Sequence, residues 1–264
     1  MKLSLAILLA FALAACGGPA DNSDAAAPDT AAPAEVSIYA AAVANAQRPD
    51  ADRQRDAGRK PAEVLEFLGI EPGMTVLDMF SGGGYYTELL SYTVGDSGRV
   101  IAQSNEAYLQ FVGDEFDMRY LGGRLANTEV LMAENNELAL EPDSLDAIML
   151  VLSFHDLYFA DPENGWPAID IDTLLAEFRS GLKADGIIGI VDHHAAAGSP
   201  SETGGTTHRI DPAIVIETMS AAGFVLDGQS DILRNPDDDY DKTVFDAELR
   251  GKTDRFVMRF VKAD

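Results

Sequence analysis

The chain has 264 residues, of which 47% are hydrophobic and 24% charged, and this balance supports a folded domain with a sizeable core. Its 19 basic and 44 acidic residues leave a formal net charge of −25 at pH 7. This excess of negative charge repels phosphate backbones and anionic lipid faces. The sequence therefore argues against a nucleic-acid partner and against membrane binding through the folded domain.

The first 15 residues have the features of a signal peptide. Lys2 precedes an apolar run of about a dozen residues, too short to cross a bilayer comfortably, and small residues then lead to Cys16. This stretch resembles the lipobox of bacterial lipoproteins, which implies that Cys16 is lipidated and becomes the mature N-terminus. The alternative is an ordinary secretory signal with a chance cysteine. Because Gly17 stands where an inner-membrane lipoprotein often has aspartate, we expect a lipid anchor in the outer membrane, facing the periplasm.

Three further segments follow the signal peptide. Residues 16–35 hold the candidate lipidated cysteine and a run of Gly, Pro, Ala and acid, which predicts a disordered tether. Residues 36–60 mix a helical pattern with many charges and predict an exposed lead-in. Residues 61–264 predict a single domain.

Strands and helices alternate along this domain. Apolar runs predict seven strands, over residues 73–80, 98–104, 128–133, 144–154, 187–192, a stretch after 223, and 255–261. Amphipathic patterns predict helices over 61–70, 85–94, 106–121, 171–183 and 211–223. This alternation predicts an α/β fold with a mainly parallel sheet, whose sites lie at the carboxyl ends of the strands.

A glycine-rich turn joins the first strand to its helix in VLDMFSGGGYYTELL, residues 76–90. Asp78 ends the apolar run, and Gly82, Gly83 and Gly84 precede the helix. Glycine permits positive φ and close approach of a ligand to the backbone, and the helix start offers free N–H groups. A tight strand-to-helix corner is the plainer alternative for this stretch.

The order of these motifs resembles class I S-adenosylmethionine-dependent methyltransferases over about residues 61–262. The acid-x-x-x-Gly-x-Gly spacing is met by Asp78, Gly82 and Gly84, and residues 138–146, LALEPDSLD, are similar to the segment before the family's fourth strand. The resemblance implies a Rossmann-like seven-stranded methyltransferase sandwich with an antiparallel last strand. It also implies S-adenosylmethionine as cofactor, bound by Asp78, Ser81, Gly82 and Gly84.

The end of the second strand departs from the family pattern. Members usually carry an acid there to hold the ribose hydroxyls, whereas this chain has Ser104. Asn105 or Glu106 can accept a ribose hydrogen bond instead. Glu134, after the third strand, matches the region that usually meets the adenine.

All four histidines follow the fourth or fifth strand: His155, His193, His194 and His208. One interpretation is that they only tie or decorate loops. A second is acid–base chemistry, since an oxygen or nitrogen acceptor loses a proton on methylation. In that case His155 is the first candidate and His193 the second, with Asp156 or Asp192 to orient the imidazole. A third is a divalent zinc, iron or manganese site on some of the four histidines, although adjacent side chains point in different directions.

Two other features lie near the same strand ends. Trp166 lies in an insertion after the fourth strand, where methyltransferases often build acceptor sites. The loop 195–209 is rich in small residues and predicts a mobile lid.

The sequence as a whole predicts methyl transfer to a small-molecule acceptor in the cell envelope. The alternative is a methyltransferase fold reused as a metal-dependent enzyme or a ligand-binding lipoprotein. That alternative arises because S-adenosylmethionine is made in the cytosol. A purely structural envelope protein ranks third, because it gives no reason to place every histidine at the strand ends.

Overall fold

The computed structural model describes residues 36–263, and Cys16, the signal peptide and the tether lie outside this part. One seven-stranded sheet organises the described chain, in the order β3-β2-β1-β4-β5-β7-β6. Its strands are β1 Thr75–Met79, β2 Arg99–Ser104, β3 Thr128–Met132, β4 Leu145–Val151, β5 Leu182–His193, β6 Phe224–Ser230 and β7 Arg255–Lys262. Only β7 runs antiparallel to its neighbours, as expected.

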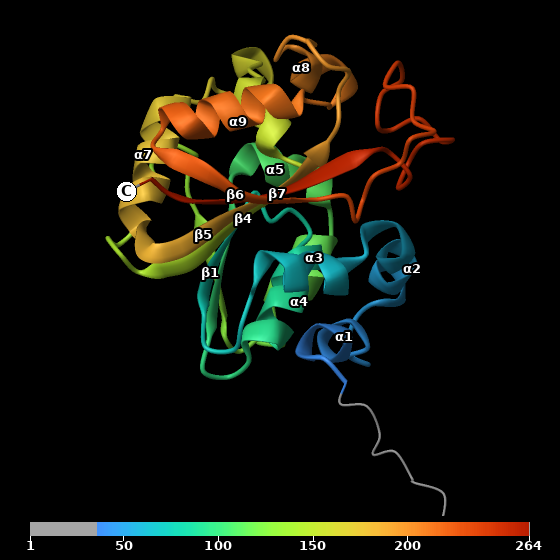
Figure 1. Ribbon diagram of the computed structural model, residues 1–264. Helices are drawn as coiled ribbons and strands as arrows, with labels where there is room; N and C mark the ends of the chain where they lie inside the picture. The colour runs from blue at the N-terminus through green and yellow to red at the C-terminus, as the bar shows by residue number, and fades with distance from the viewer. Residues whose placement is uncertain (1–35, 264) are drawn as a thin grey trace, which may run out of the picture. The chain divides into compact units, whose positions relative to one another are not determined.

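Helices cover both faces of this sheet, and Figure 1 shows α7 and α9 on one side and α3 and α4 on the other. The α-helices are α1 Ile38–Val43, α2 Asp50–Arg59, α3 Pro61–Leu68, α4 Tyr85–Val94, α5 Glu106–Val112, α6 Glu115–Tyr120, α7 Ile171–Gly181, α8 Thr203–Thr207 and α9 Pro212–Ala221. Two 3₁₀ helices, η1 Phe154–Tyr158 and η2 Pro162–Asn164, follow β4. Within residues 36–263, no helix combines the length and apolarity that a membrane crossing requires.

The core has two layers because successive strand residues face opposite sides. In β1, Leu77 and Met79 pack with Phe178 of α7 on one face, and Val76 packs with Leu89 of α4 on the other. All five are fully buried, and each contributes roughly 1.5–3 kcal/mol relative to an exposed side chain. Because helices cover both faces of the sheet, the carboxyl ends of the parallel strands lie together at one end of it.

Four expectations about local structure need correction. The helix expected over 106–121 is two helices, because the backbone of Gly113 turns to φ +57°. The strand expected to reach residue 154 ends at Val151, because Leu152 adopts φ +59° and η1 follows. The lead-in 36–60 is not simply exposed, since α1 and α2 pack on the domain and Arg48 and Asp52 are buried. The loop 195–209 contains α8, which packs on η1.

Candidate active site

The glycine turn lies at the carboxyl end of β1. Gly82 and Gly84 adopt φ +55° and +75°, and the Gly84 N–H donates to the Ser81 carbonyl at 2.9 Å. Asp78 is buried, and its Oδ2 accepts a hydrogen bond from Thr87 Oγ1 at 2.5 Å. Burial raises the pKa of Asp78 to about 6, although the Thr87 hydrogen bond opposes the shift.

A cavity of about 180 Å³ lies over this turn. Asp78, Ser81 and Gly82 line it, whereas Gly84 lies beneath Tyr120 and does not. An added Cβ at Gly82 would meet no atom closer than 4.0 Å, so the backbone is open to a ligand there. The resulting space is a shallow cradle with a carboxyl group at its base.

Two arginines of α2 form the wall of this glycine-turn cavity. The guanidinium of Arg59 lies 4.5 Å from the Tyr85 ring centroid, and burial lowers its pKa. Within residues 36–263, Arg59 has no hydrogen-bond or ion-pair partner. Arg55 pairs with Asp52, but its buried Nε has no acceptor in the described chain. Both side chains are half-buried, and cations placed in this way favour an anionic ligand such as a carboxylate.

A buried ion-pair network holds α2 and α6 over the turn. Arg119 of α6 pairs with Glu88 of α4 and, at 2.8 Å, with Asp52 of α2. Its Nε also donates to the Gly83 carbonyl at 2.8 Å. Arg124 contributes a second cation to Glu88. The walls of the cavity are therefore fixed to its floor by charge-assisted contacts.

The end of β2 carries a polar cluster where a ribose acid was expected. Asn105 caps α5 by accepting from the Tyr108 N–H, and its Nδ2 lies 3.4 Å from Glu134 Oε2. Gln103, which the sequence analysis did not single out, accepts from the Phe80 N–H at 3.0 Å. The Ser104 hydroxyl is buried and has no partner in the described chain. None of these four polar residues lines the glycine-turn cavity, so the structure does not place the predicted Asn105 and Glu134 in it.

A second, larger cavity of about 700 Å³ opens on the other side of Leu152. We call it the histidine cavity; its lining residues include Tyr108, Leu152, His155, Asp156, Phe159, Trp166, His193, His208 and Phe245. Leu152 lines both cavities, so the two lie side by side at the carboxyl end of β4.

An aromatic row forms one wall of the histidine cavity. Phe80 of the glycine turn stacks on Tyr108 at 4.9 Å between centroids, and Tyr108 contacts Trp166 at 5.2 Å. Trp166 also contacts Phe159 at 5.8 Å. Trp166, which lies in the insertion after β4, is therefore part of a cavity wall.

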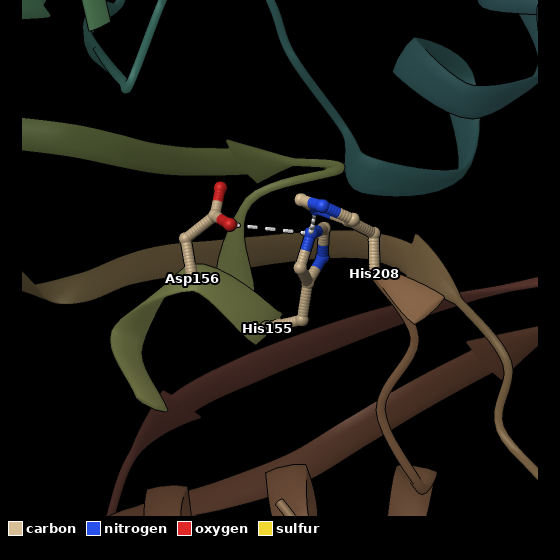
Figure 2. Close-up of side chains that lie close together, drawn as sticks. All are labelled: His155, Asp156 and His208. Carbon is tan, nitrogen blue, oxygen red and sulfur yellow. Dashed lines mark hydrogen bonds and ion pairs between the residues drawn. The ribbon is translucent and has the colours of Figure 1, made fainter. Parts of the chain in front are cut away.

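His155 lies at the centre of a polar cluster in this cavity. Its Nδ1 is 2.8 Å from Asp192 Oδ1, and its Nε2 is 3.2 Å from His208 Nδ1 and 3.3 Å from Asp156 Oδ1. Burial alone would lower the pKa of His155, but the carboxylates of Asp192 and Asp156 raise it to about 9. Figure 2 shows the side chains of His155, Asp156 and His208 directed toward one another.

The side chains of the other two histidines, His193 and His194, point to different places. His193 lines the cavity, and its Nδ1 is 2.8 Å from Thr253 Oγ1. Burial and the charge of His155 lower the pKa of His193 well below its ordinary value. His194 stacks on Tyr240 at 5.4 Å and does not line the cavity. The four histidines therefore do not converge, because His194 lies apart from the other three.

Several residues beside the two cavities have a strained backbone. Among residues 36–263, seven non-glycine residues have positive φ, and three of them line the two cavities. They are Phe80 at +56°, Leu152 at +59° and His208 at +56°. Such strain is typical of functional sites, where the surrounding structure enforces an unfavourable conformation.

Comparisons with known proteins find methyltransferases. Residues 39–112 match the family described as protein-L-isoaspartate(D-aspartate) O-methyltransferase. Over 50 residues, the chain is 44% identical to the ubiquinone/menaquinone biosynthesis C-methyltransferase UbiE of Legionella pneumophila strain Lens. This alignment covers 19% of the chain and 20% of that protein, so the chain spans about a fifth of the length of this curated relative.

Solved structures share the whole fold. A SAM-dependent methyltransferase from Aquifex aeolicus has a TM-score of 0.55 and 23% identity, over 82% of this chain and 99% of the other. An S-adenosylmethionine-dependent methyltransferase from Mesorhizobium loti has a TM-score of 0.53 and 13% identity, over 79% and 100%. The expected seven-stranded methyltransferase fold is thus confirmed.

Proposed function

We propose that the chain is an S-adenosylmethionine-dependent methyltransferase that acts on a small molecule held in the histidine cavity. The observation that carries this proposal is that the two cavities lie side by side at Leu152, at the carboxyl end of β4. The family match supports it, because residues 39–112 include α2, the glycine turn and the end of β2. The shared fold of known S-adenosylmethionine-dependent enzymes supports it further.

The residues of the glycine-turn cavity fit the methionine end of this cofactor. Its carboxylate suits the unpartnered guanidinium of Arg59, and its ammonium group suits the buried carboxyl of Asp78. The orphaned hydroxyl of Ser104 and the side chain of Asn105 suit the ribose hydroxyls. When bound, S-adenosylmethionine supplies an electrophilic methyl group on a positively charged sulfur.

The histidine cavity offers the methyl acceptor an apolar binding surface and a base. The aromatic row from Tyr108 to Trp166 offers flat apolar surface, which favours a small molecule with an apolar or aromatic body. His193 is the proton acceptor in this assignment, because its lowered pKa keeps it neutral. With Nδ1–H donating to Thr253, Nε2 keeps its lone pair.

Calorimetric titration of the purified protein with S-adenosylhomocysteine tests this proposal. We expect saturable binding that Gly82→Val abolishes, because the new side chain fills the cradle. Gly69→Val is the matched control, since Gly69 also has positive φ with open space around it but lies at the end of α3. Absence of binding to a folded protein, or equal loss in both variants, would contradict the proposal and favour a reused fold without methyl transfer.

We also propose that the protein is anchored in the cell envelope through Cys16, which lies outside the described residues. The lipobox-like sequence before this cysteine supports the proposal. Metabolic labelling with a fatty-acid analogue should mark the wild-type protein and not Cys16→Ala. Equal labelling of both would refute the anchor.

A further inference from the structure

We propose that His155, Asp156 and His208 form a divalent transition-metal site in the histidine cavity. The inference rests on the proposed function and adds to it a metal ion that the methyl acceptor would bind. Its three donor atoms are His155 Nε2, Asp156 Oδ1 and His208 Nδ1, all within 4.8 Å of one another (Figure 2). Two imidazoles and one carboxylate are a ligand set that zinc, iron(II), manganese and cobalt share.

The spacing of the donors suits one metal ion. Two nitrogens 3.2 Å apart, each about 2.1 Å from the same ion, subtend roughly 100° at that ion. The 3.3 Å separation of His155 Nε2 and Asp156 Oδ1 gives an angle of about the same size. Both angles lie between the octahedral and tetrahedral values.

The outer contacts of the donors orient them. Asp192 Oδ1 holds His155 Nδ1 at 2.8 Å, which leaves Nε2 directed at the shared point. Asp192 is itself fixed, since its Oδ2 accepts from the His155 N–H at 2.8 Å and its Oδ1 from the His193 N–H at 2.7 Å. The Tyr108 hydroxyl donates to Asp156 Oδ2 and leaves Oδ1 free. Metal-ligating histidines and carboxylates usually have such outer partners.

The third donor, His208, lies far from His155 in the sequence, and contacts within the fold fix its position. His208 ends α8 in the left-handed region, at φ +56°, and its ring contacts Phe245 at 4.7 Å. Gly204 of α8 lies against the His155 carbonyl so closely that no side chain would fit. The close approach of α8 to η1 therefore sets the distance between the two imidazoles.

The charge of the cluster also favours a cation. Asp156 and Asp192 are both close to His155, and within residues 36–263 neither has a Lys or Arg partner in an ion pair. A divalent ion bound by three protein donors keeps open positions toward the cavity. An acceptor that binds there through oxygen, nitrogen or sulfur loses its proton more readily, so that a weak base such as His193 suffices.

The competing interpretation is that the 3.2 Å contact of His155 and His208 is only a hydrogen bond. Titration of the chelator-stripped protein with Co²⁺, followed by its visible absorption, separates the two. We expect one equivalent of Co²⁺ to bind, with at least tenfold weaker binding in His208→Asn. Asparagine tolerates the left-handed backbone and removes the imidazole. His194→Ala is the control, because His194 lies outside the cavity, and it should bind as the wild type does.

Two further variants keep the inference falsifiable if His208→Asn proves unstable. Asp156→Asn should abolish the absorption, and Tyr108→Phe should weaken binding by roughly 10- to 100-fold through the lost outer contact. No stoichiometric binding to the folded wild type would overturn the inference, as would equal loss in His194→Ala. Titration with S-adenosylhomocysteine on the same stripped samples reports the cofactor site separately, so the two proposals fail independently.

Discussion

The two cavities at the ends of β1 and β4 are built in different ways. The glycine-turn cavity has a floor from one contiguous stretch, residues 78–86, and walls fixed by buried ion pairs from α2 and α6. The histidine cavity takes its polar atoms from η1, the end of β5 and the end of α8, and its walls are aromatic. The first is suited to a fixed, charged ligand and the second to a variable, largely apolar one.

The largest expected effect falls on the arginine–carboxylate network that holds the glycine-turn cavity. Arg119→Met leaves Asp52 and Glu88 buried without this cation and should lower the free energy of unfolding by about 3–5 kcal/mol. Urea denaturation followed by circular dichroism measures the change. Arg99→Met breaks the exposed pair with Glu129 and should cost only about 0–1 kcal/mol. Similar costs for both would show that the network does not hold the cavity together.

The second prediction concerns Arg59 in the wall of the glycine-turn cavity, where a substitution should weaken cofactor binding without a large loss of stability. Arg59→Met keeps the aliphatic stem but removes the cation proposed for the cofactor carboxylate. S-adenosylhomocysteine binding should weaken by about 1.5–3 kcal/mol, or roughly 10- to 100-fold, because a charge-assisted hydrogen bond is lost. The unfolding free energy should change by no more than about 1 kcal/mol, since the Arg59 guanidinium contacts the Tyr85 ring but forms no ion pair within the described chain. Unchanged affinity would remove α2 from the cofactor site.

A pH dependence should mark the glycine-turn cavity. Below about pH 6 Asp78 is protonated and neutral, because burial raises its pKa to about 6, and above that pH it attracts the cofactor ammonium. Affinity for S-adenosylhomocysteine should therefore rise roughly tenfold from about pH 5 to about pH 7. Tyr86 and Tyr120 face this carboxyl, and burial raises the pKa of each to about 12, so neither titrates in that range. A rise that persists in Asp78→Asn would assign it to another group.

The smallest effect is spectroscopic and reports only on the histidine cavity. Trp166 is the single tryptophan of the chain and lines that cavity. Co²⁺ at the proposed site should partly quench its emission in the wild type and not in His208→Asn. Quenching of the same size in both proteins would place the metal elsewhere.

The sequence predicted the glycine-turn floor better than its walls. Asp78, Ser81 and Gly82 lie within five residues of one another, so local spacing sufficed to place them in one cavity. Arg55 and Arg59 were missed because a run of charges does not reveal which side chains turn inward. Their spacing of four residues, which puts both on one helix face, was the available signal.

Prediction of the histidine cavity was limited for a different reason. The strand assignments correctly placed His155 after β4, whereas His193, expected after the fifth strand, is the last residue of β5. The clustering of His155 with His208 depends on how α8 packs on η1. The opposite direction of His194 depends on its stacking against Tyr240, a residue 46 positions away in the chain. Such long-range contacts leave no periodic pattern in the sequence.

A crystal structure of the protein with S-adenosylhomocysteine tests the central claim most directly. The account predicts the ligand carboxylate on Arg59, its ammonium group beside Asp78, and its sulfur directed past Leu152 toward the histidine cavity. A ligand bound away from the glycine turn, or with its sulfur directed away from that cavity, would contradict the account.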